Sequence, residues 1–134
     1  MMKNYKTLSS SKFLLQYHFI FVCKYRRKIL TRLREDVLSC METISNRYDF
    51  SIRIQEIDND HIHLLIESVP RLSPSQIARV LKQESTMTLW ERHSSYLSQF
   101  YWKERTLWSD GYFVSSIGNV SEETVRKYIE NQGR

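Results

Sequence analysis

Residues 50–67 read FSIRIQEIDNDHIHLLIE and decide the fold. In the first half of this stretch apolar and polar residues alternate, which predicts a half-buried strand. The apolar positions are Phe50, Ile52 and Ile54. The strand ends at the turn signal Asp58-Asn59-Asp60, and a second strand over residues 61–67 follows at once. Two short strands joined by such a turn favour an antiparallel hairpin.

The second strand of this hairpin carries two histidines on one face. His61 and His63 lie two apart, so their side chains project from the same side with Cα atoms about 6.6 to 7 Å apart. Ile62, Leu64 and Ile66 face the opposite way, into the core. Two imidazoles held like this can converge on one divalent ion, which also needs a third ligand and open positions for a substrate. The same pair also fits ordinary polar positions on a half-exposed strand.

An interior strand and an amphipathic helix precede the hairpin. Residues 16–24 are β-branched and aromatic on both faces, which predicts a strand inside a sheet that is covered on both sides. The apolar residues that come next recur at steps of three and four, which is typical of one face of a helix. They are Leu33, Val37, Met41, Ile44 and Tyr48.

A helix, a last strand and a terminal helix follow the hairpin. The helix opens with a capping box that has proline at its first position. The residues concerned are Ser73, Pro74 and Gln76. Residues 94–106 carry aromatics among polar residues, and we expect them to be irregular. Residues 112–117 predict the last strand, Gly118-Asn119 break it, and Ser121 opens a helix with acids in its first turn.

This order of elements, β, α, β, β, α, β, α, indicates the α+β class. We expect an antiparallel sheet with covering helices in the split β-α-β, ferredoxin- or RRM-like arrangement. The 134 residues fit one domain, with residues 1–12 as a polar tail and residues 120–134 as the terminal helix. A chain of this length can bury a core without a disulfide, so Cys23 and Cys40 are expected to be buried free thiols.

Composition narrows the function classes. An apolar share of 41% and a charged share of 26% exclude a wholly disordered chain. The sequence contains no run of about 18 apolar residues, and residues 1–12 are polar. We therefore expect no membrane span, no secretory signal and a cytoplasmic location.

The formal net charge is +5, and the basic residues crowd into residues 24–34. This run has no acid and contains an aromatic side chain, which is typical of a surface that contacts phosphates and stacks on bases. The DNA-binding candidates are Lys24, Tyr25, Arg26, Arg27 and Lys28. A solvated loop at the start of a helix is the alternative interpretation.

The terminal helix offers a third group of polar side chains. Tyr128 and Gln132 are four residues apart, one turn and about 6 Å along the helix axis. If this face docks on the histidines, the Gln132 carbonyl can join a metal shell while the Tyr128 hydroxyl points at a substrate. The alternative is an amphipathic helix whose tyrosine and glutamine lie at the edge of the core.

These residues carry a resemblance to a known family. The motif Asp60-His61-Ile62-His63-Leu64-Leu65-Ile66-Glu67, followed by Tyr128-Ile129-Glu130-Asn131-Gln132, resembles the HUH single-tyrosine transposases of the smallest bacterial insertion sequences, the TnpA type. The similarity covers residues 16–132. It includes Tyr17-His18-Phe19 ahead of the basic run and Ser73-Pro74-Ser75 at the start of a helix.

The resemblance implies an HUH fold, a reaction and a set of roles. His61, His63 and Gln132 are expected to hold Mg²⁺ or Mn²⁺, and Tyr128 is expected to attack single-stranded DNA and keep the bond energy in a 5′ phosphotyrosine link. A 3′ hydroxyl from another DNA end reseals the strand, so no nucleotide cofactor is needed. The family also implies DNA hairpins at the element ends and a homodimer whose terminal helix crosses to the partner, so that the subunits share their active sites.

Three other interpretations stay open at this point. A non-catalytic reader of single-stranded nucleic acid has the same architecture, although such modules place aromatics where this chain has histidines. A domesticated relative would apply the same chemistry to repeated palindromes. A metal-dependent hydrolase would use water and leave Tyr128 a structural role.

Overall fold

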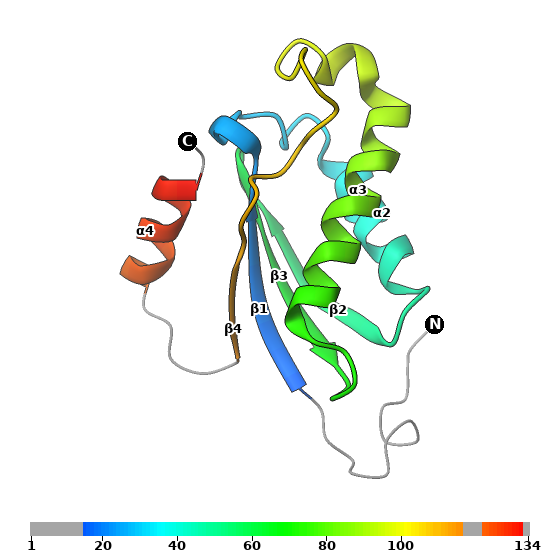
Figure 1. The fold of residues 1–134 in the computed structure, drawn as a ribbon, viewed down its shortest axis with the longest axis vertical. Coiled ribbons are helices and arrows are strands. Elements are labelled where there is room, and N and C mark those ends of the chain that lie inside the picture. Colours follow the sequence, from blue (N-terminus) through cyan, green and yellow to red (C-terminus); the bar gives the residue numbers. More distant parts are fainter. Residues whose placement is uncertain (1–14, 117–121, 133–134) are drawn as a thin grey trace.

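The structure, a computed structural model, describes residues 15–116 and 122–132 (Figure 1). The predicted order of strands and helices is confirmed, with one added 3-10 turn. The elements are β1 (Leu15–Val22), η1 (Lys24–Arg26), α2 (Arg34–Ser45), β2 (Phe50–Ile57), β3 (His61–Ser68), α3 (Pro74–Leu97), β4 (Phe113–Ser116) and α4 (Glu122–Gln132). The expected polar tail, the Gly118-Asn119 break and the Ser121 cap lie outside the described residues.

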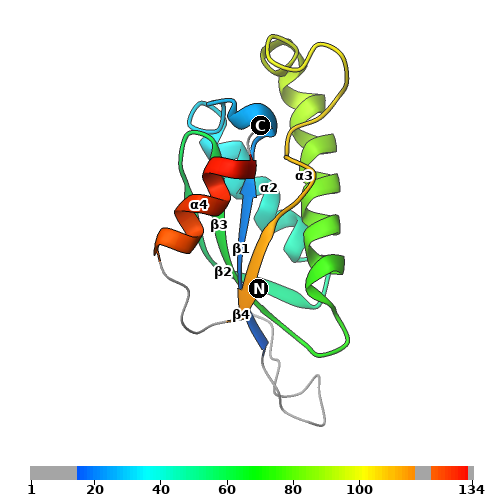
Figure 2. The same cartoon turned by 60° about the vertical axis from the view of Figure 1, so that its left-hand side comes forward.

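The sheet has the strand order β2-β3-β1-β4, and each neighbouring pair is antiparallel. Helices α2 and α3 cover one face, and α4 lies against the other (Figures 1 and 2). The predicted α+β class and the hairpin of β2 and β3 are therefore confirmed. Within the two described ranges, every helix is too short or too polar to cross a membrane.

The core fills the space between the sheet and the α2–α3 layer. Phe19 and Phe21 of β1 and Ile62, Leu64 and Ile66 of β3 are fully buried there. Each such side chain contributes about 1.5–3 kcal/mol when it leaves water. Their helical partners include Val37, Met41, Ile44, Ile77, Leu81 and Leu89. Because the apolar side chains of β3 face this layer, its histidines are left on the opposite side of the sheet, as the alternation predicts.

Helix α3 begins where the sequence predicts, but it extends into the segment that was expected to be irregular. The Ser73 hydroxyl accepts from the Gln76 amide at 3.1 Å, and the Ser73 amide donates to Gln76 Oε1 at 2.8 Å, so the capping box is confirmed. The prediction of an irregular segment over residues 94–106 is wrong at its start, because the helix continues to Leu97. Leu97 lies seven residues after Trp90, and both are buried, so two further turns keep one apolar face.

Strand β2 contains a bulge that the alternation does not predict. The register with β3 shifts by one residue at Arg53, and Ile54 therefore faces away from the core and is 50% exposed, contrary to expectation. Beyond the bulge Glu56 pairs with His63, while Ile57 turns toward the core. A regular strand would bury the Glu56 carboxylate and expose Ile57, so the bulge removes a costly buried charge.

The two cysteines are free and buried, as expected. Burial raises the pKa of both thiols, which keeps them protonated and unreactive. Strand β1 ends two residues earlier than predicted, because Cys23 pairs with Trp108 in an isolated bridge before the chain enters η1.

Deleting Arg53 should be tolerated, because this residue is the extra one in the bulge and its loss leaves Glu56 and Ile57 on their present faces. We expect ΔArg53 to unfold cooperatively in urea. Its free energy of unfolding should fall by no more than about 1 kcal/mol, the usual contribution of a surface ion pair such as that of Arg53 with Glu67. Deleting Leu65 from the bulge-free β3 is the control, and it should abolish folding because it moves Ile66 off the core face. Equal losses for the two deletions would contradict this description of β2.

Candidate active site

The histidine face of the sheet is defined by the register of three strands. His63 pairs with Ile20 of β1 and with Glu56 of β2, and His61 pairs with Val22. Directly opposed residues of antiparallel strands point to the same side. The face opposite the core therefore gathers two imidazoles and a carboxylate on an apolar floor.

The two predicted ligands converge. His61 Nε2 lies 3.1 Å from His63 Nε2, and Asp58 Oδ2 lies 2.9 Å from His61 Nε2. One donor atom from each of these three residues lies within 4.8 Å of the others. Two imidazoles and a carboxylate make a donor set that suits a divalent cation. Sequence reasoning did not assign Asp58 to the site and treated it only as part of a turn.

A buried carboxylate fixes the orientation of His61. The Nδ1 of His61 donates to Asp60 Oδ1 at 2.8 Å, and the other oxygen of Asp60 accepts from Arg26 Nε at 3.0 Å. Burial acts to raise the pKa of Asp60, but the hydrogen bonds from His61 and Arg26 outweigh it and hold that pKa below its usual value. The Asp60 carboxylate thus stays charged and holds the His61 ring with its Nε2 turned toward Asp58 and His63.

A third histidine, His18, supports His63 in the same way. Its Nε2 lies 3.0 Å from His63 Nδ1, and the two rings stack with centroids 5.2 Å apart. Burial lowers the pKa of both residues, and for His63 the neighbouring His61 and His18 lower it further. Both rings are therefore neutral at pH 7. With both Nδ1 atoms engaged by Asp60 and His18, the Nε2 atoms of His61 and His63 face each other across the space that a cation would occupy.

Helix α4 brings Tyr128 over this face. The ring of Tyr128 lies 5.4 Å from that of Phe113, which pairs with Ile20 and lies 6.3 Å from the ring of His18. The Tyr128 hydroxyl is buried without a hydrogen-bond partner among the described residues. Burial, with a smaller effect of Tyr112, raises the pKa of Tyr128 to about 12.

Gln132 ends the same helix. The backbone therefore sets Tyr128 and Gln132 one turn apart, as predicted. The side chain of Gln132 lies outside the described part of the chain, and its role as a ligand stays a prediction.

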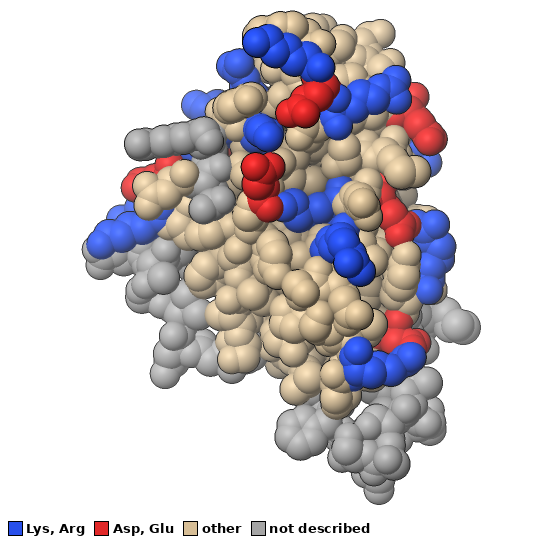
Figure 3. All heavy atoms as spheres, in the orientation of Figure 1, with Lys and Arg blue, Asp and Glu red and all other residues tan. Residues whose placement is uncertain are grey.

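The five DNA-binding candidates divide into two groups. The Lys24 ammonium lies 3.5 Å from the Asp110 carboxylate and 3.7 Å from that of Glu104, and Arg26 forms an ion pair with Asp60. Both basic residues are therefore already paired with acids of the same chain. The other three are exposed, and they are Tyr25, Arg27 and Lys28. Figure 3 shows further Lys and Arg side chains among acidic ones on the face that it presents, so the basic surface is not a single block.

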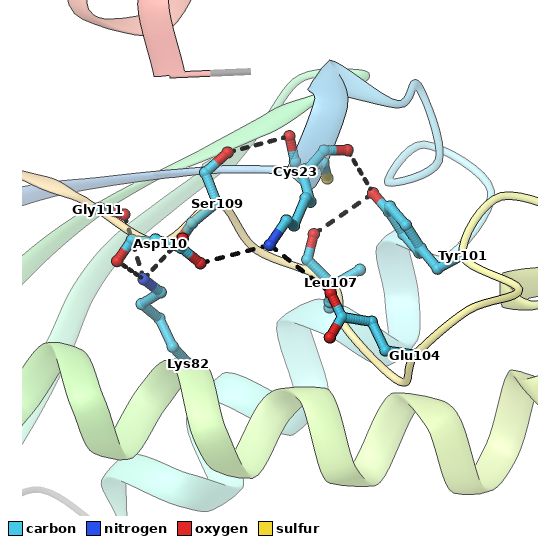
Figure 4. A network of polar contacts seen from close by, with 9 residues as sticks. Cys23, Lys82, Tyr101, Glu104, Leu107, Ser109, Asp110 and Gly111 are labelled. Atoms are coloured by element: carbon cyan, nitrogen blue, oxygen red, sulfur yellow. Dashed lines mark hydrogen bonds and ion pairs between the residues drawn. The ribbon is translucent and has the colours of Figure 1, made fainter. Parts of the chain in front are cut away.

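A polar network ties the segment after α3 to the end of β1 (Figure 4). Lys82 of α3 donates to the carbonyls of Ser109, Asp110 and Gly111 at 2.8, 2.9 and 3.2 Å. The Tyr101 hydroxyl donates to the Lys24 carbonyl at 2.9 Å. The turn η1, which carries the exposed Tyr25, is therefore tied to the segment after α3 by the Tyr101 hydrogen bond.

Comparison with solved structures agrees with this fold. A solved structure of a Deinococcus radiodurans transposase superposes with a TM-score of 0.80 over 98% of both chains at 26% identity. A REP-associated tyrosine transposase solved with a REP hairpin shares the fold, with a TM-score of 0.57 at 13% identity, over 88% of this chain and 64% of the other.

Sequence comparison identifies the family. The transposase of insertion element IS200 from Salmonella typhimurium is 30% identical over 95% of this chain and 82% of its own length. The ISDra2 transposase TnpA of Deinococcus radiodurans is 24% identical over 88% of this chain and 84% of its own. The family model described as IS200-like transposase matches residues 11–132. The chain therefore belongs to the IS200-like transposase family.

Proposed function

We propose that this transposase cleaves and rejoins single-stranded DNA at the ends of an insertion sequence through a 5′ phosphotyrosine intermediate. The observation that carries the proposal is the convergence of His61 and His63 on the face that α4 covers with Tyr128. In this proposal Tyr128 is the nucleophile, and His61, His63 and Gln132 hold Mg²⁺ or Mn²⁺.

The donor set fits such an ion. Asp60 binds the Nδ1 of His61 and His18 binds the Nδ1 of His63, so both rings are held with their Nε2 atoms facing each other. When bound, a divalent cation offsets negative charge on the phosphate and on the leaving oxygen. Asp58 is placed to add a carboxylate to the same shell.

The proposed reaction is an exchange of phosphodiester bonds. The Tyr128 hydroxyl loses its proton as its oxygen bonds to phosphorus, the bond from phosphorus to the 3′ oxygen breaks, and the released 3′ oxygen takes up a proton and becomes a hydroxyl. Attack by a 3′ hydroxyl of another DNA end on the phosphotyrosine reverses these changes and frees Tyr128. Bond energy is conserved, so the proposal needs no nucleotide cofactor.

In the described arrangement Tyr128 is not ready to react. Its hydroxyl is buried and unpartnered among the described residues, and its pKa is raised to about 12, so ionisation at neutral pH is unfavourable. We therefore infer that α4 leaves its position against Phe113 before cleavage. Docking on the histidine face of a second subunit would provide such a change, and we propose a homodimer with shared active sites.

Hairpin DNA is the proposed substrate. The REP-associated tyrosine transposase that shares this fold is solved with a hairpin, and the exposed Arg27 and Lys28 offer cations for phosphates. Processing of repeated palindromes by a domesticated relative would use the same residues, and the DNA sequences flanking the gene distinguish these two biological roles.

Tyr128→Phe removes one oxygen and little packing, so this variant should fold and bind DNA but form no covalent adduct. A denaturing gel with end-labelled DNA from the element ends should show a protein-shifted band for the wild type only. His63→Ala and the wild type in EDTA should also lack the band. An adduct formed by the Tyr128→Phe protein would place the nucleophile elsewhere, and cleavage without any adduct would favour hydrolysis by water.

Asp60→Ala should weaken Mn²⁺ binding about 10- to 100-fold, because a ligating histidine then loses the carboxylate that orients it. Isothermal titration of the folded protein measures this affinity without DNA. Asp36→Ala is the matched control, since it removes the same charge from α2, on the core side of the sheet. Equal Mn²⁺ affinities for the Asp60→Ala protein and the wild type would show that Asp60 does not orient a metal ligand.

A mixed dimer of one Tyr128→Phe chain and one His63→Ala chain tests site sharing. If each tyrosine serves the partner, one site combines intact histidines with an intact tyrosine, and the heterodimer regains about one active site that neither homodimer has. The chains are tagged differently, co-expressed and purified as the heterodimer before the adduct is assayed. A DNA-binding heterodimer that forms no adduct would refute sharing.

A further inference from the structure

A hollow outside the histidine cluster lies between η1 and the segment that follows α3. Its volume is about 540 Å³, and its lining includes Tyr25, Arg27, Tyr101, Trp102 and Lys103. Pockets of about 300–1,000 Å³ are usual for small ligands. None of the residues that line it belongs to the histidine cluster.

Two large aromatic side chains are exposed at this hollow. Trp102 is 68% exposed and Tyr25 is 56% exposed, and they are the only aromatics among the four most exposed large hydrophobic residues in the described ranges. An aromatic ring left in water presents a face on which another flat ring can stack. Their meeting at one hollow points to a flat aromatic ligand.

The backbone holds Tyr25 in an unusual conformation. Tyr25 and Arg26 have φ of 58° and 51°, in the left-handed region that non-glycine residues avoid. Two contacts keep the turn in place, namely the hydrogen bond from Tyr101 to the Lys24 carbonyl and the ion pair of Arg26 with Asp60 (Figure 4 shows Tyr101). Tyr25 is thus displayed by a turn that is fixed before any ligand arrives.

The charge at the hollow favours an anionic ligand. Arg27 and Lys103 line it and are exposed, whereas the acid that lines it, Glu104, lies 3.7 Å from the Lys24 ammonium. Stacking rings combined with free cations are the recurring features of sites for single-stranded nucleic acid. A base inside a duplex has both faces stacked and cannot enter such a site.

We propose that this hollow binds one unpaired nucleobase of the DNA, stacked on Trp102 and Tyr25, with the adjoining phosphates on Arg27 and Lys103. The proposal rests on the proposed function, because it takes the substrate to be single-stranded DNA. Arg26, the residue after Tyr25, reaches Asp60 and through it His61, so the hollow flanks the histidine face. In this proposal the bound base belongs to the strand that continues to the cleavage site.

Binding of an oligonucleotide from the element end, measured by fluorescence anisotropy in EDTA, tests the proposal. Trp102→Ala should weaken binding roughly 5- to 100-fold, the usual contribution of one base stacked on an aromatic side chain. Trp102→Phe should restore most of the affinity. Met87→Ala, which removes another exposed apolar side chain outside the hollow, should bind like the wild type.

An abasic nucleotide placed in turn at each unpaired position identifies the bound base. At one position the wild type should lose affinity while the Trp102→Ala protein loses no more, because the two changes remove the same contact. Unchanged binding by Trp102→Ala, or additive losses at every position, would overturn the proposal and leave the proposed function standing. A wild type that does not bind the oligonucleotide would overturn both.

Discussion

The antiparallel pairing of β1 with β3 is the constraint on which the rest of the structure depends. In this register Phe19 and Phe21 share the core face with Ile62 and Leu64, so the histidines of β3 take the other face. A slip of one residue would bury the histidines and expose the core. The free energy of apolar burial therefore also places the chemical groups, and no separate interaction is needed to keep the imidazoles outside the core.

On that outer face the polar groups support one another in a chain. Arg26 binds Asp60, Asp60 orients His61, His61 faces His63, and His63 is held by His18. His61 and His63 thus each have one nitrogen held by a neighbour and one nitrogen facing the space between them. The first member of the chain belongs to the turn that displays Tyr25, so the proposed DNA contacts and the proposed metal site share one rigid frame.

Much of this arrangement could be predicted from the sequence, because alternation and helical spacing report burial directly. Ile62, Leu64 and Ile66 define the core face of β3, and that is enough to place His61 and His63. The bulge at Arg53 could not be predicted in this way, since it reverses the alternation within one strand. The sequence feature that indicates the bulge is Glu56, because regular alternation would have placed its charge in the core.

Other parts of the site depend on contacts between distant segments. His18 lies 45 residues before His63 in the chain, and only strand pairing brings their rings together. The sequence feature that places His18 at the site is its position two residues before Ile20, on the face of the strand opposite Phe19. The hollow at Trp102 joins η1 to a segment after α3 that the sequence presented as irregular. Gln132 and the exchange of α4 between subunits stay predictions that rest on the family resemblance.

The most direct measurement is to identify the amino acid that carries the DNA. The covalent complex formed with an element-end oligonucleotide is digested with trypsin and nuclease, and the modified peptide is sequenced by mass spectrometry. The residual nucleotide should lie on Tyr128, within the peptide of residues 128–134, and should be joined through its 5′ phosphate. A nucleotide on any other residue, or one joined through its 3′ end, would contradict the assignment of Tyr128 as the nucleophile.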